Sequence, residues 1–148
     1  MRKILFFLFI FSIFNNIVLS QTLYNLEGKD FDFDKINSFE NVILFFWTSQ
    51  CPYCVAELNR LNKNFDFSKY KDIRFFYINI GESKSKVSNF INYLKLISNI
   101  KENVFLDSFG FLSEKYNVRA IPFYVFLKNG KVVKTGFFLN DRIIEEVF

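Results

Sequence analysis

Residues 42–58 read VILFFWTSQCPYCVAEL, and this stretch decides the fold. Its first six residues form a continuous apolar run, which is typical of a strand buried on both faces. Pro52 suits the first turn of a helix, where its missing N–H has no partner to lose. We therefore expect a strand over residues 42–47 that passes, through Cys51, into a helix over residues 52–62.

Cys51 and Cys54, at this junction, are the only two cysteines in 148 residues. A disulfide between them closes a loop too small to add much stability. Zinc prefers four ligands, and the chain has no further Cys and no His. A copper relay site needs additional His or thioether ligands, and the only methionine is Met1. The residues therefore favour a redox couple and indicate no metal site and no cofactor.

The predicted place of the two cysteines assigns them different roles. A sulfur at a helix N-terminus faces free backbone N–H groups and the positive end of the helix dipole, and both favour the reactive thiolate. We expect Cys51, at the helix start, to be the attacking sulfur. Cys54 follows about one turn later on a deeper face, from which it can resolve a mixed disulfide by attacking Cys51.

The rest of the chain alternates strand and helix patterns, which predicts an α/β fold with a central mixed sheet covered on both faces. A small N-terminal hairpin is expected at residues 22–33, with its turn at Glu27-Gly28. Further strands are predicted at 73–80, 104–106, 122–127 and 131–137. Further helices are predicted at 83–98, capped by Ser83 or Ser85, at 108–116 and at 141–148.

Composition excludes one large class of partners. The formal net charge is +4, and two of the basic residues, Arg2 and Lys3, lie in the N-terminal segment. The remaining charge is nearly balanced and the lysines are scattered, so we expect no binding of nucleic acid.

The N-terminal residues 1–20 have the pattern of a secretory signal peptide. A basic start precedes an apolar run from Ile4 to Phe14, and Val18 and Ser20 fit a cleavage site. The alternative is an uncleaved anchor, although the run is shorter than the roughly 20 apolar residues that span a bilayer. In either case residues 21–148 are expected to form one exported domain, in the periplasm or on the outer face of the cytoplasmic membrane.

Three segments together resemble the TlpA-like group of exported thioredoxin-fold thiol–disulfide oxidoreductases, which are related to cytochrome c maturation thioredoxins. They are YNLEGKDF (24–31), FFWTSQCPYCVAEL (45–58) and NVRAIPFYVFLKNGKVVKTG (117–136). The helix and strand predicted between 83 and 106 match a unit that this group inserts into the plain thioredoxin fold.

The resemblance implies further site residues. Ile121-Pro122 matches the cis-proline element that faces the cysteine pair and binds a substrate strand. Trp47 is expected to shield the sulfur and offer a docking surface, although it could be a plain core residue. Pro52 and Tyr53, between the cysteines, are expected to contact substrate.

Glu57 stands where the group has an active-site glutamate. It is expected to accept the Cys54 proton, with a raised pKa if it is partly buried. The alternative for Glu57 is an exposed helix glutamate that forms an ion pair with Arg60, three residues along the helix.

The group also suggests an electron direction and partners. The resemblance implies that the protein is a monomer that reduces protein disulfides, with apocytochrome c as a candidate substrate, and that a membrane thiol carrier re-reduces it. The chain departs from the group, however, because its proline follows the first cysteine instead of preceding the second, and Asn59 replaces a usual proline. The residues between the cysteines tune the reduction potential, so these departures leave the direction of electron flow open.

Three rival functions stay open. Thr48-Ser49-Gln50-Cys51 matches the T-x-x-C pattern of peroxiredoxins, with Arg119 as the arginine candidate, but Leu44 stands where those enzymes carry proline. CPYC also occurs in glutaredoxins, whose Gly-Gly glutathione-binding stretch is missing here. The third is a redox-inactive thioredoxin-fold binding module.

Overall fold

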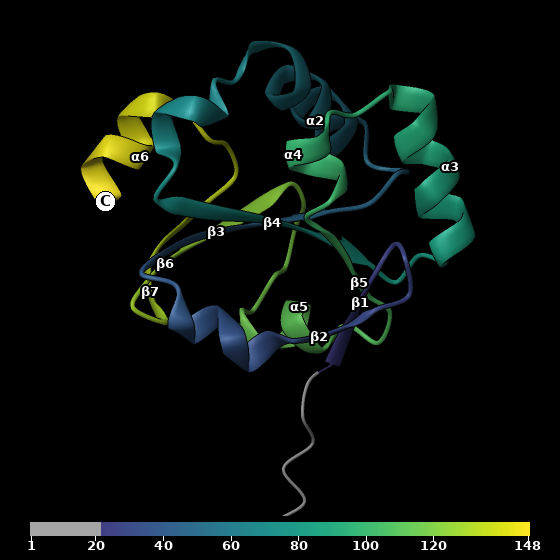
Figure 1. The fold of residues 1–148 in the computed structure, drawn as a ribbon, viewed down its shortest axis with the longest axis horizontal. Coiled ribbons are helices and arrows are strands. Elements are labelled where there is room, and N and C mark those ends of the chain that lie inside the picture. The colour runs from purple at the N-terminus through teal and green to yellow at the C-terminus, as the bar shows by residue number, and fades with distance from the viewer. Residues whose placement is uncertain (1–21) are drawn as a thin grey trace, which may run out of the picture.

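A computed structural model of the chain describes residues 22–148. Their strands form one seven-stranded mixed sheet (Figure 1). The predicted signal segment, residues 1–20, lies outside these described residues. The strands are β1 (Thr22–Asn25), β2 (Asp30–Asp32), β3 (Asn41–Trp47), β4 (Ile73–Ile80), β5 (Val104–Asp107), β6 (Phe123–Lys128) and β7 (Lys131–Gly136), in the spatial order β2-β1-β5-β4-β3-β6-β7. The predicted mixed sheet is therefore confirmed.

The strand directions bring four loops to one edge of the sheet. β3, β4 and β5 are parallel, so their carboxyl ends meet at that edge, where Trp47 pairs with Asn79 and Ile80 with Asp107. β6 is antiparallel to β3 and begins at the same edge, because Phe46 pairs with Phe123. The edge therefore gathers the segment after β3, the segments after β4 and β5, and the segment before β6.

The helices cover both faces of the sheet. They are α2 (Pro52–Asn64), α3 (Lys84–Leu94), α4 (Ser98–Lys101), α5 (Phe111–Lys115) and α6 (Asp141–Val147), with short 3₁₀ turns η1 (Phe33–Ser38) and η2 (Phe67–Tyr70). Figure 1 shows α2, α3, α4 and α6 on one side, and α5 on the other.

Two hydrophobic cores result, one on each face. The side chains of strand β3 alternate between the two cores. Ile43, Phe45 and Trp47 point into the core under α2 and α3. Val42, Leu44 and Phe46 point into the core under η1 and α5. The apolar run of residues 42–47 is buried throughout, as predicted for a strand covered on both faces.

The main departure from prediction is in the helix expected over residues 83–98. Ser83 caps its start, as expected, by accepting the N–H of Lys86. The helix ends at Leu94, however, because Lys95 takes a left-handed conformation with φ of 53°. The buried Leu96 follows, and α4 starts as a separate short helix. No helix among residues 22–148 has the length and apolar character needed to cross a membrane.

Candidate active site

Cys51 and Cys54 form a disulfide at the start of helix α2, with their Cα atoms 5.2 Å apart. Cys51 is the N-cap residue, and its Sγ accepts the backbone N–H of Cys54 at 3.1 Å. Cys51 is half-buried, whereas Cys54 is 0% exposed and belongs to the core. The two sulfurs therefore differ in access in the way that the sequence predicts, with Cys51 outside and Cys54 inside.

The Ile121-Pro122 segment faces this pair from the start of β6. Its peptide bond is cis, as the resemblance implied. The carbonyl oxygen of Ile121 lies 3.8 Å from the Cys51 Sγ, although the two residues are 70 positions apart in the chain. Both Ile121 and Pro122 are half-buried, so part of this segment is open to a ligand beside the half-buried sulfur.

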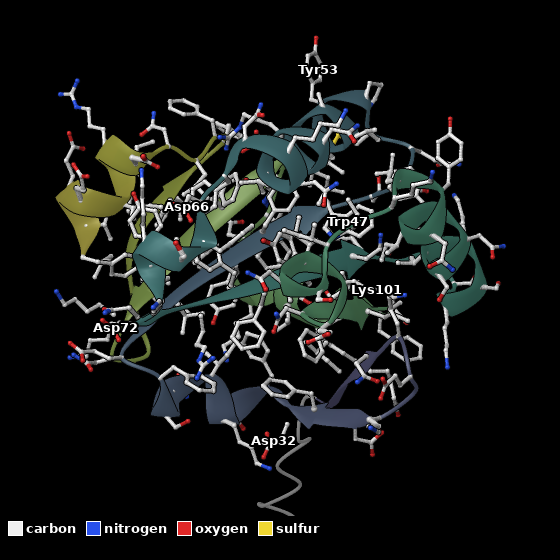
Figure 2. The ribbon with its side chains drawn as sticks, turned by 45° about the horizontal axis from the view of Figure 1, so that its top comes forward. Asp32, Trp47, Tyr53, Asp66, Asp72 and Lys101 are labelled. Atoms are coloured by element: carbon white, nitrogen blue, oxygen red, sulfur yellow. A yellow bond between two sulfur atoms is a disulfide. The ribbon has the colours of Figure 1, made fainter. Side chains whose placement is uncertain are left out.

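The aromatic residues of the motif have opposite surroundings. Tyr53 is 78% exposed and points away from the molecule (Figure 2). Pro52, the preceding residue, is also exposed. Trp47 lies inside, 0% exposed, with its ring centroid 5.8 Å from that of Phe90. The prediction that Trp47 offers a docking surface is wrong, because its whole side chain is used to fill the core. The burial agrees with the alternative, a core tryptophan, and the shielding of the Cys51 sulfur by Trp47 stays a prediction.

Glu57 has a different environment from the one predicted. Its carboxylate accepts two hydrogen bonds from Arg60, both at 2.8 Å, and one from the hydroxyl of Tyr124 at 2.7 Å. Arg60 also donates to the carbonyl of Leu139 at 2.7 Å. Burial raises the pKa of Glu57, but the hydrogen bonds from Arg60 and Tyr124 outweigh this effect and leave the pKa below its ordinary value.

This result corrects the expectation of a raised pKa. A carboxylate with a lowered pKa is a poorer proton acceptor. The structure contains the ion pair with Arg60 that the alternative predicted, but Glu57 is not an exposed helix residue, because only 12% of its side chain is exposed. The pair also connects α2 to the segment between β7 and α6 through Leu139.

A second carboxylate near the motif, Glu82, was missed from the sequence. It follows β4, and it accepts both the backbone N–H of Ser49 at 2.7 Å and the Ser49 hydroxyl at 2.6 Å. The order of the predicted strands could have indicated this contact, because the carboxyl ends of adjacent parallel strands lie at the same edge of a sheet. Residues just after β3 and β4 are therefore expected to meet.

In the structure, Arg119 and Thr48, the residues of the peroxidase alternative, form hydrogen bonds with partners other than the Cys51 sulfur. The guanidinium of Arg119, which is exposed, donates to the side-chain oxygen of Asn117 at 2.6 Å. The carbonyl of Thr48 accepts the backbone N–H of Cys51 at 3.4 Å, so Thr48 contributes to a turn. Within residues 22–148 no three His, Cys, Asp or Glu side chains gather closely enough to hold a metal ion.

Comparisons with known proteins agree with this geometry. The sequence profile of the AhpC/TSA family matches residues 15–146. The sporulation thiol-disulfide oxidoreductase A of Bacillus subtilis is 32% identical over 120 residues, which cover 79% of this chain and 62% of that relative. The chain thus spans less than two thirds of that relative's length.

Two solved structures share the fold and more than a quarter of the aligned residues. The crystal structure of StoA from Bacillus subtilis has a TM-score of 0.68 at 27% identity, covering 84% of this chain and 92% of StoA. The pneumococcal exposed lipoprotein thioredoxin from Streptococcus pneumoniae has a TM-score of 0.60 at 27% identity, covering 85% and 96% of the two chains. The predicted thioredoxin fold and the resemblance to thiol–disulfide oxidoreductases are confirmed.

Proposed function

The chain belongs to the AhpC/TSA family, and from this premise we propose that it is a thiol–disulfide oxidoreductase with Cys51 and Cys54 as its redox couple. The observation that carries the proposal is the half-buried Cys51 sulfur, held at the start of α2 and 3.8 Å from the Ile121 carbonyl, with a fully buried partner cysteine bonded to it. This arrangement supports attack by one sulfur and resolution by the other.

The reaction that we propose starts from the reduced pair. The Cys51 thiolate attacks one sulfur of a substrate disulfide, and the other substrate sulfur leaves as a thiolate, which takes a proton from solvent. Cys54 then attacks the Cys51 sulfur of this mixed disulfide, which releases the second substrate thiol and leaves the Cys51–Cys54 disulfide. Two electrons pass to the substrate. The N–H of Cys54, 3.1 Å from the Cys51 Sγ, supports the thiolate of Cys51.

Substrate contacts are assigned to the exposed and half-buried residues around Cys51. Pro52 and Tyr53 lie on the outer side, and Ile121 and Pro122 lie on the β6 side. We propose that the segment of Ile121 and Pro122 binds the substrate chain next to its disulfide. Glu57 is left out of the proton transfer, because its pKa is lowered.

The wider setting of the reaction is also proposed. The signal-like residues 1–20 and the description of a pneumococcal relative as an exposed lipoprotein support export. In that setting we expect the protein to be a monomeric reductant of protein disulfides, apocytochrome c among the candidates, that is re-reduced by a membrane thiol carrier. Cell fractionation with and without residues 1–20 tests the export.

Disulfide reduction by the purified chain tests the central proposal. The reduced protein should accelerate the reduction of insulin by dithiothreitol, and Cys51→Ser should abolish the acceleration. Cys54→Ser should instead accumulate a mixed disulfide through Cys51, because the resolving sulfur is missing. The proposal fails if the reduced wild-type protein exchanges with no disulfide. Consumption of hydrogen peroxide that is lost in Cys51→Ser would favour the peroxidase alternative.

A further inference from the structure

Glu82 is a largely buried carboxylate, 8% exposed, with a full set of hydrogen-bond donors. Its Oε1 accepts the Ser49 hydroxyl at 2.6 Å and pairs with the Lys86 ammonium at 2.7 Å. Its Oε2 accepts the Ser49 backbone N–H at 2.7 Å and the amide of the buried Asn79 at 2.8 Å. A buried charge is costly unless it is paired and hydrogen-bonded, so four donors on two oxygens indicate a built feature.

Ser49 connects this carboxylate to the reacting sulfur. Ser49 and Gln50 lie between Thr48 and Cys51, whose carbonyl and N–H close a turn at 3.4 Å. The turn carries Cys51 from the end of β3 to the start of α2. Two of the four bonds to Glu82 come from Ser49, one from its backbone and one from its side chain. Glu82 therefore fixes both the backbone and the side chain inside the turn.

The end of β4 is shaped to place the carboxylate there. Gly81 has a φ of +69°, which favours glycine, and its N–H bonds to the carbonyl of Asp107 at 3.1 Å. The chain thus turns directly after β4, and Glu82 reaches the neighbouring turn after β3. The Cys51 sulfur has only two close polar neighbours among the described residues, the N–H of Cys54 and the carbonyl of Ile121. Small movements of the turn would change both distances.

We propose that Glu82 is a positioning residue for the redox couple, whose carboxylate holds the Thr48–Cys51 turn so that the Cys51 sulfur stays against the start of α2 and the Ile121 segment. The inference rests on the proposed function. It assigns a role in the rate of attack to a side chain that touches neither sulfur. Lys86 has a smaller role, because it balances the charge of Glu82 and forms no hydrogen bond with Ser49 among the described residues.

Alkylation of the reduced full-length chain by iodoacetamide, followed from pH 5 to 10, tests the proposal through the Cys51 thiolate itself. Glu82→Gln keeps the side-chain shape but removes the charge and replaces one acceptor oxygen with a donor. We expect a fall of at least about tenfold in the alkylation rate at pH 7, because a misplacement of about 1 Å can cost about 100-fold. The pH midpoint of alkylation should rise as Cys51 loses the helix N-terminus. In insulin reduction, kcat should fall and KM should stay.

Matched variants separate positioning from stability and from charge. Ser49→Ala removes one hydroxyl-to-carboxylate bond, and Ser113→Ala removes the equivalent bond to Asp107, a buried carboxylate at the end of β5. Ser49→Ala should slow alkylation and Ser113→Ala should not. Lys86→Met leaves both Ser49 bonds in place and should stay closer to wild type than Glu82→Gln does.

The outcomes distinguish this inference from the proposed function. If Glu82→Gln lowers only the unfolding midpoint and leaves the alkylation rate, its pH midpoint and kcat unchanged, Glu82 is merely structural and the inference is overturned. An equal effect of Ser113→Ala would overturn it as well. If wild type reduces no disulfide, the proposed function fails, but the alkylation comparison still decides whether Glu82 positions Cys51.

Discussion

Two glutamates near the redox couple show how the surroundings of a carboxylate decide its use. Glu57 lies on α2 and is held by Arg60 and Tyr124, whereas Glu82 follows β4 and is held by Ser49, Asn79 and Lys86. In both, hydrogen bonds to the charged form outweigh burial and lower the pKa. Both side chains therefore stay ionised at neutral pH and act through the groups that they hold.

Substitution of Glu57 should separate structure from proton transfer. Glu57→Gln loses the charge that pairs with Arg60, and we expect the free energy of unfolding to fall by about 1–3 kcal/mol, the usual cost of weakening bonds to a charged group. Because the pKa of Glu57 is below its ordinary value, the carboxylate stays mainly ionised between pH 5 and 8. The pH profile of insulin reduction over that range should therefore keep its shape. Loss of a rising limb in Glu57→Gln would restore Glu57 as a proton acceptor.

Acid should weaken the contribution of Glu82 to stability. Burial alone would raise the pKa of Glu82, but bonds from Asn79, Lys86 and Ser49 lower it to about 2, from 4.5 in the free side chain. A group with a lowered folded-state pKa stabilises the fold above its unfolded pKa, and this contribution is lost as the pH falls through the folded value. The free energy of urea unfolding should thus be larger for the wild type than for Glu82→Gln at pH 6. The difference should shrink between pH 4.5 and 2. A constant difference over this range would contradict the assignment.

The sequence could locate both cysteines but not the partners of either glutamate. Cys51 and Cys54 were identified by their rarity and by the strand and helix around them. The prediction for Glu57 failed because its pKa depends on Tyr124, 67 residues away, and Glu82 was missed because its bond to Ser49 spans 33 residues. Local spacing contains no direct information on such contacts, and strand direction gives only the shared edge.

At the scale of elements, the period of the hydrophobic residues predicted the order and type of the helices and strands well, but it predicted poorly where each one ends. The expected hairpin, the buried strand of residues 42–47 and the helix after the cysteines are all present. The predicted helix over 83–98 kept its apolar face but breaks after Leu94, since Leu96 and Ile100 both reach the core from a chain that changes direction at Lys95. No glycine marks this break.

Substitution of Lys95 by glycine should stabilise the fold. Its φ of 53° is left-handed, a conformation that costs a residue with a side chain about 1–2 kcal/mol and that glycine adopts readily. Lys95→Gly should therefore raise the free energy of urea unfolding by up to about 1 kcal/mol. The matched control is Asn89→Gly, at an exposed position in the middle of α3, which should lower the free energy of unfolding by about 0.5–1 kcal/mol. Equal losses in both variants would show that the break at Lys95 is absent in solution.

At the scale of the whole molecule, the sheet joins segments that are distant in the sequence into one edge. β3 delivers the cysteine turn, β4 delivers Glu82 and β6 delivers the Ile121 segment, and their pairing fixes all three relative to one another. Cys54, which is 0% exposed, is part of the core under α2 and α3. The oxidation state of the couple is therefore linked to the stability of the complete fold and not only to the loop.

This linkage gives a test of electron direction. Folding and oxidation are thermodynamically linked. If folding favours the disulfide over the dithiol, the oxidised protein must have a larger free energy of unfolding than the reduced protein. For the proposed reductant we expect the oxidised protein to be more stable in urea. The difference should be about 1.4 kcal/mol for every 30 mV by which folding lowers the potential of the couple. Cys54→Ser, which cannot close the disulfide, should unfold alike with and without reductant. A more stable reduced protein would instead indicate an oxidant, in which folding favours the thiol form of Cys51 and Cys54.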